Sequence, residues 1–146
     1  MPSRPESRKP RERVYIALGS NLGDREGYLH RAREALAALP GTALVAASAI
    51  EETAPLGGMP QPPYLNQMVL LETTLDPRAL LEACQAIERQ EGRQRKERWG
   101  SRTLDIDIVR FSDRRVSESD LIIPHPELPN RDFWRREMAD IDSHER

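Results

Sequence analysis

The chain has 146 residues, of which 32% are charged and 38% hydrophobic, and its formal net charge is -2 at pH 7. This length suits one domain with a buried core, and so small a net charge gives no field that would attract nucleic acid or a membrane surface. No apolar run approaches the roughly 18 residues of a membrane-spanning helix. The single cysteine, Cys84, excludes an internal disulfide and a cysteine-based metal site, so we expect a cytoplasmic protein.

The first half of the chain predicts a tail, three strands and one helix. Residues 1–13 are rich in proline and arginine without an apolar stretch, so we expect a disordered tail, with one domain over 14–146. The compact apolar run at 14–18 predicts a central strand that ends in a turn with two glycines. Apolar residues at helical spacing follow until Pro40-Gly41 stops the helix. Residues 42–53 and 64–74 predict two more strands, separated by an irregular, proline-rich loop.

The second half predicts a helix and a further strand. Asp76-Pro77 combines a capping aspartate with proline at the first helical position, and Gly92 ends the helix. A basic stretch at 93–102 leads into a strand at 103–111, and short extended pieces follow at Val116 and 121–123. The order β-α-β-β-α-β predicts an α+β, ferredoxin-like domain, in which a split β-α-β antiparallel sheet carries two helices on one face.

The strand at 103–111 carries two aspartates beside the basic stretch. Alternate strand residues share a face, so Asp105 and Asp107 converge, while Leu104, Ile106 and Ile108 form an apolar face behind them. Carboxylates suit one or two hard cations, and the five basic residues of 93–102 suit phosphate oxygens. This combination predicts phosphoryl or pyrophosphoryl transfer from a nucleotide. With little apolar anchoring, we expect 93–102 to be mobile without ligand.

Several motifs carry a family resemblance. Residues 98–108 have the highly specific sequence Arg-Trp-Gly-Ser-Arg-Thr-Leu-Asp-Ile-Asp-Ile. The other matching pieces are Ala-Leu-Gly-Ser-Asn-Leu-Gly at 17–23, Thr-Ala-Pro-Leu-Gly at 53–57, Tyr-Leu-Asn at 64–66, Gly-Arg-Gln-Arg at 92–95, Pro-His-Pro at 124–126 and Asn-Arg-Asp-Phe at 130–133. From about Val14 to about Phe133, in order and spacing, they resemble the 6-hydroxymethyl-7,8-dihydropterin pyrophosphokinase family of folate biosynthesis.

This resemblance implies an activity, its cofactors and its catalytic residues. Family members transfer pyrophosphate from ATP to the hydroxymethyl oxygen of the pterin, release AMP and use two magnesium ions. By resemblance, Asp105 and Asp107 hold the ions, and Arg93 and Arg102 assist the transfer. The partners implied are these small molecules, with no nucleic acid and no membrane, and we expect a monomer.

The resemblance also implies two sets of binding residues. For ATP they are Gln85, Glu88, Arg95, Trp99, Arg102, Ile108, His125 and Arg131, with Ile108 at the adenine. For the pterin they are Thr53, Pro55, Leu56, Tyr64, Asn66, Trp99 and Phe133. The aromatics Tyr64 and Phe133 suit stacking on a flat heterocycle, and the Asn66 amide offers both a donor and an acceptor to its edge. By residue type alone, Tyr64 and Phe133 would be core aromatics and Glu88 a solvated helix residue.

Among the departures of the chain from the family pattern, two concern the nucleotide pocket and the C-terminal segment. Pro126 stands where some relatives have an aromatic residue. After Phe133, charged residues stand where relatives continue with an apolar strand, so we expect an atypical segment from about 134 that is disordered, remodelled or completed by another chain. Two alternatives follow: a ferredoxin-like module whose basic tail and loop bind RNA, and a relative that binds ATP or pterin without turnover.

Overall fold

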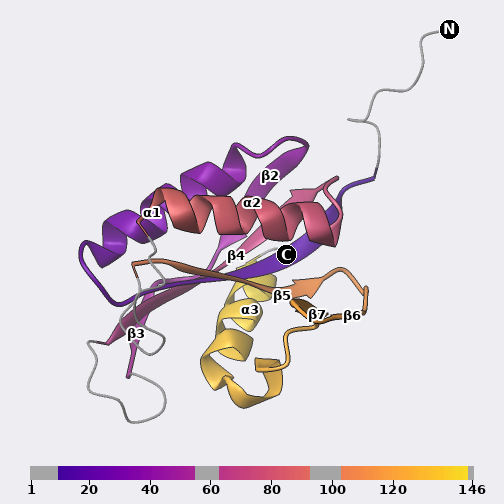
Figure 1. The fold of residues 1–146 in the computed structure, drawn as a ribbon. Helices are drawn as coiled ribbons and strands as arrows, with labels where there is room; N and C mark the ends of the chain where they lie inside the picture. The colour runs from indigo at the N-terminus through magenta and orange to yellow at the C-terminus, as the bar shows by residue number, and fades with distance from the viewer. Residues whose placement is uncertain (1–9, 55–62, 93–102, 145–146) are drawn as a thin grey trace, which may run out of the picture.

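A computed structural model describes residues 10–54, 63–92 and 103–144. Its elements are β1 (Glu12–Ser20), α1 (Arg25–Ala37), β2 (Thr42–Ala47), β3 (Glu51–Thr53), β4 (Tyr64–Thr73), α2 (Pro77–Gln90), β5 (Asp105–Phe111), β6 (Val116–Glu118), β7 (Leu121–Ile123), the 3-10 helix η3 (Leu128–Asn130) and α3 (Asp132–His144) (Figure 1). The strand β1 begins two residues before the predicted domain boundary at 14, and residues 1–9 of the predicted tail lie outside the described residues.

The main sheet has the strand order β2-β4-β1-β5, with β3 also paired to β4, and its pairs are antiparallel. The central strand β1 therefore lies between two strands that are distant from it in sequence. This is the predicted split β-α-β arrangement, and the α+β fold class is confirmed. The strands β6 and β7 form a separate two-stranded sheet.

The strand predicted over 42–53 is two strands, because the pairing with β4 is interrupted at Ser48. The Ser48 N–H donates to the Met68 carbonyl at 2.8 Å, and the Ser48 hydroxyl then accepts from the Met68 N–H at 2.9 Å. A side-chain oxygen thus takes the place of the backbone acceptor, and the ladder is interrupted there. Pairing with β4 resumes at Glu51, opposite Asn66.

Helices cover both faces of the sheet. The helices α1 and α2 bury their apolar sides against one face, together with Ile16, Val69 and Ile108 of the strands. The opposite face carries a second core around Ala17 and Met68, which α3 covers. Figure 1 shows α1 and α2 on one side of the sheet and α3 on the other. The two helices predicted on one face are present, and α3 adds a third layer.

The segment after Phe133 is helical, so disorder is the wrong expectation for its described part. Residues Asp132–His144 form α3, in which the buried positions are spaced as one face of a helix: Trp134, Glu137, Met138 and Ile141. The charges that suggested disorder lie around this face and include anchors to the sheet. The Tyr15 hydroxyl donates to the Asp142 carboxylate, and Arg136 pairs with Glu51 at 3.1 Å.

No helix within the described ranges combines the length and the apolar character required to cross a membrane.

Candidate functional site

The sheet face beside α3 brings together residues from three strands. Gly19 of β1 pairs with Asn66 of β4 on one side and with Asp105 of β5 on the other, and Ala17 in the same way lies between Met68 and Asp107. Directly paired residues share a face, so Asn66 and Asp105 lie on one surface, roughly 10 Å apart, two strand spacings. Asn66, predicted to bind the edge of the pterin, therefore lies on the same sheet face as the predicted metal ligands Asp105 and Asp107.

The two aspartates are half-buried, and the residues that alternate with them are buried among α1 and α2. The predicted acidic and apolar faces of this strand are thus confirmed. Just beyond Asp107 the register with β1 shifts, because Val109 is an extra residue in β5. A β-bulge of this kind bends the strand locally. Here the side chain of Val109 packs in the core on the α3 side of the sheet.

Glu88 holds β5 from the opposite face. Its side chain is buried on α2, and its Oε2 accepts a hydrogen bond of 2.7 Å from the N–H of Ile106. Ile106 lies between the two aspartates, so this contact fixes the strand that presents them. The reading of Glu88 as a solvated helix residue is wrong. Gln85, one turn earlier on the same helix, is exposed.

His125 faces Asp107, with its Nε2 at 3.8 Å from the Asp107 Oδ1. The His125 backbone N–H donates to the Val109 carbonyl, and the Nδ1 accepts from the Glu127 N–H at 3.0 Å. Burial, reinforced by the charge of Arg131, lowers the pKa of His125. A neutral ring that accepts at Nδ1 carries its proton on Nε2, so an N–H points toward Asp107.

Trp134 packs against His125 and its neighbours. It is buried, and its ring meets the His125 ring edge-to-face with centroids 4.9 Å apart. The Arg131 guanidinium lies 4.5 Å from the centroid of the same ring. Trp134 therefore contacts two residues expected at ATP, although its own position carried no signal in the sequence beyond being aromatic. Phe133, half-buried, packs against the same core with its centroid 6.2 Å from Trp134.

The residues expected at the pterin edge meet at the start of β4. The Asn66 Nδ2 donates to the Thr53 Oγ1 at 2.6 Å, and Tyr64 lies two residues earlier on the same face of the strand. A Cβ on Gly19 would lie 3.5 Å from the Asn66 Oδ1 and 3.6 Å from the Tyr64 Cδ1. A glycine at this position therefore leaves space in front of both side chains.

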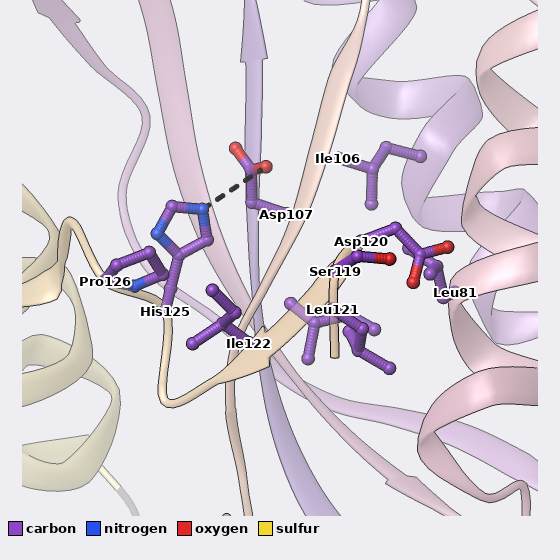
Figure 2. A pocket seen from close by; sticks show the side chains of 10 residues that line it. Leu81, Ile106, Asp107, Ser119, Asp120, Leu121, Ile122, His125 and Pro126 are labelled. Carbon is purple, nitrogen blue, oxygen red and sulfur yellow. Dashed lines mark ion pairs between the residues drawn. The ribbon is translucent and has the colours of Figure 1, made fainter. Parts of the chain in front are cut away.

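A pocket of about 250 Å³ opens along the free edge of β5 (Figure 2). Its walls come from α2, β5, the β6–β7 hairpin and the segment after β7, through Leu81, Ile106, Asp107, Ile108, Ser119, Asp120, Leu121, Ile122, His125 and Pro126. Figure 2 shows Asp107 and His125 facing each other on one side, with Asp120 and Leu81 on the other. The structure thus joins the predicted residues Asp107, Ile108 and His125, and places Pro126 beside them.

The hairpin residues and Leu81 were not predicted for this pocket. Leu81 has the spacing of a core residue on its helix, and the hairpin has no motif that indicates a site. Six predicted residues, Pro55, Leu56, Arg93, Arg95, Trp99 and Arg102, lie outside the described residues, as does the predicted mobility of 93–102.

Comparison with known proteins adds to this geometry. The profile of the family described as 7,8-dihydro-6-hydroxymethylpterin-pyrophosphokinase (HPPK) matches residues 15–143. The 2-amino-4-hydroxy-6-hydroxymethyldihydropteridine pyrophosphokinase of Bacillus subtilis (strain 168) is 43% identical over 128 residues, which cover 88% of this chain and 77% of the relative. The protein of the same name from Pseudomonas putida is 48% identical over 114 residues, 77% of this chain and 93% of the relative. The chain belongs to the 7,8-dihydro-6-hydroxymethylpterin-pyrophosphokinase family.

Proposed function

We propose that this protein transfers pyrophosphate from ATP to the hydroxymethyl group of 6-hydroxymethyl-7,8-dihydropterin and releases AMP, a step of folate biosynthesis. The observation that carries the proposal is the row Asn66, Gly19 and Asp105 across three strands. This row places an amide that can hydrogen-bond the edge of a heterocycle beside carboxylates that can hold metal ions on a triphosphate. The family membership supports the same pair of substrates.

The pocket at the β5 edge suits the adenosine end of ATP. Leu81, Ile106 and Ile108 supply apolar walls for a flat base. On the side of the pocket where His125 faces Asp107, the Nε2–H of neutral His125 is placed to donate to a phosphate oxygen. A nucleotide bound this way directs its phosphates along the α3 face toward Asp105.

Asp105 and Asp107 fit magnesium by their donor chemistry. They are two half-buried carboxylates on one strand face, and magnesium prefers one or two carboxylates completed by phosphate oxygens and water. The remaining ligands would come from phosphate oxygens of the nucleotide and from water. Bound there, the metal supplies charge neutralisation at the transferred group.

The pterin would lie over Gly19, between the β4 residues and Phe133. Asn66 pairs through its amide with the pyrimidinone edge, and Tyr64 and Phe133 supply aromatic faces for the ring. This places the hydroxymethyl group on the side of Asp105. Positioning and charge complementarity then account for the chemistry, and the reaction requires no dedicated general base.

The proposal is tested by measuring AMP release from ATP in the presence of the hydroxymethyldihydropterin and magnesium. We expect pterin-dependent AMP formation, and a loss on the order of 100-fold or more in Asp105→Asn and Asp107→Asn with unchanged folding. Asp113→Asn, at an exposed turn residue, is the matched control and should retain wild-type activity. Binding of both ligands without AMP release would instead identify a relative that binds without turnover.

A further inference from the structure

The β6–β7 hairpin forms one wall of the pocket but is a small element. Each strand has three residues, and the hairpin pairs with no other strand of the described residues. Its residues Leu121 and Ile123 are buried in the core beside α2, while Asp120 and Ile122 lie at the pocket. An isolated two-stranded hairpin is marginally stable. The shape of this wall therefore depends on what holds the tip of the hairpin.

Arg78, in the first turn of α2, holds that tip. Its two terminal nitrogens reach the two oxygens of Asp120 at 2.8 and 3.0 Å, and one of them also contacts Glu118. This is the paired arrangement in which a guanidinium binds a carboxylate in one fixed orientation. The contact raises the pKa of Arg78 and lowers the pKa of Asp120, so both groups are charged across the physiological range.

The position of Arg78 on α2 links this contact to the pocket. Leu81 follows three residues later, so the two side chains lie one above the other on the same side of the helix. Leu81 faces the pocket that Asp120 lines from the hairpin. The Arg78–Asp120 contact thus closes the same gap between α2 and the hairpin that forms this side of the pocket.

The charge of Asp120 gives Arg78 a second effect. Asp120 lines a pocket for an anionic nucleotide, and Glu118 lies two residues away. Without a compensating cation, the Asp120 carboxylate would face the ligand, and the nearby charge of Glu118 would add to its opposition to binding. Arg78 contacts both of them and cancels much of this repulsion.

We propose that Arg78 is a positioning residue of the nucleotide pocket: it docks the hairpin tip on α2 and neutralises Asp120 where ATP binds. The inference rests on the proposed function, because it requires a nucleotide in this pocket. Arg78 is not placed to touch the pterin, which binds on the α3 face. Its effect is therefore specific to ATP.

The test compares Arg78→Gln with a matched control. Arg114 makes a similar paired contact with Glu12, at 2.9 and 2.7 Å, on β1 and outside the pocket, and its side chain is 46% exposed against 41% for Arg78. We expect Arg78→Gln to raise the KM for ATP, and the Kd of a non-hydrolysable ATP analogue measured by calorimetry, roughly two- to fivefold. The kcat, the KM for the pterin and the Tm should stay near wild type, and Arg114→Gln should change none of these.

Two further variants separate the contribution of the Arg78 charge from that of its paired contact with Asp120. Arg78→Lys keeps the charge but loses the paired geometry, so its Kd for the analogue should lie between wild type and Arg78→Gln. Adding Asp120→Asn to Arg78→Gln should not weaken binding further, because the two residues act as one unit. An additive loss, or an Arg78→Gln variant indistinguishable from Arg114→Gln while wild type turns over, overturns the role of Arg78 alone. A wild-type protein that binds no nucleotide would overturn the proposed function as well.

Discussion

The carboxylate of Glu88 accepts a hydrogen bond of 2.7 Å from the N–H of Ile106, on the residue between Asp105 and Asp107. A helix on one face of the sheet thus fixes the strand whose acidic side chains project from the other face. The bond is buried, and it gives the Ile106 N–H a partner at the edge of the sheet. The geometry of the aspartate pair depends on this contact as well as on the sheet ladder.

Replacing Glu88 with alanine should therefore affect both stability and activity. The Ile106 N–H would lose its partner in a buried setting, at a cost of about 1–3 kcal/mol in the free energy of unfolding. Glu88→Gln keeps an acceptor oxygen and should lose less stability. Urea unfolding measures the stability, and the AMP assay measures the activity. Equal stability of Glu88→Ala and wild type would contradict the assigned role.

Asn66 should affect the KM for the pterin and leave the KM for ATP unchanged. Its amide lies on the same sheet face as Asp105, on the other side of Gly19, and donates to the Thr53 hydroxyl. We expect Asn66→Ala to raise the KM for the pterin roughly 5- to 150-fold, the range for a lost buried hydrogen-bond pairing, without a comparable change in the KM for ATP. Asn66→Asp, which replaces the donor amide with a second acceptor, serves as the near-isosteric comparison. Equal effects on both substrates would argue against the assignment.

Glu137 should make stability depend on pH. Neither of its oxygens makes a hydrogen bond of regular geometry with the described residues, and burial together with the neighbouring Glu51 carboxyl raises the pKa of Glu137 to about 9, from an ordinary value of 4.5. Between these values the folded protein holds one proton more than the unfolded chain. The free energy of unfolding therefore falls as pH rises across this window, by up to about 1.4 kcal/mol per pH unit.

The variant Glu137→Gln has no titrating group at this position. Its free energy of unfolding should therefore lose the downward slope with pH that Glu137 causes. Urea titrations at pH 6, 7 and 8 would measure it, and the variant should exceed wild type in stability most clearly at pH 8. Glu82→Gln, at an exposed residue of α2, is the control and should keep the wild-type slope. Parallel slopes for Glu137→Gln and wild type would show that the folded protein does not retain this proton.

Cys84 should be unreactive in the folded protein. Its side chain is buried under the sheet, and burial, with the charges of Glu88 and Asp107 adding to it, raises the pKa of the Cys84 thiol to about 12. Reaction requires the thiolate and access to it, and both are lacking at neutral pH. Iodoacetamide at pH 8 should leave the native chain unmodified by mass spectrometry, while the urea-unfolded chain is modified. Rapid labelling without urea would show that this core opens.

Local patterns in the sequence were enough for much of the fold and the site. The capping aspartate and first-turn proline at Asp76-Pro77 predicted the start of α2, and the structure confirms it with an Asp76 side chain that accepts from the Ala79 N–H at 2.8 Å. Strict alternation around Asp105 predicted which side chains share a face. Each signal lies within a few residues, where backbone geometry alone relates position to direction.

Tertiary structure decided the features that depend on distant partners. Four buried positions make α3 a helix against the sheet, although its charge density suggested disorder, because a single apolar face suffices when a partner surface is available. The interruption at Ser48 depends on Met68, twenty residues away. Likewise, no local pattern relates Arg78 to Asp120, 42 residues later, and only the folded chain brings them together at the pocket. The sequence by itself determined the central strand, the first two helices, the acidic strand face and the family. Packing between separate elements determined α3, the interruption at Ser48, the walls of the pocket and the covering of the second sheet face.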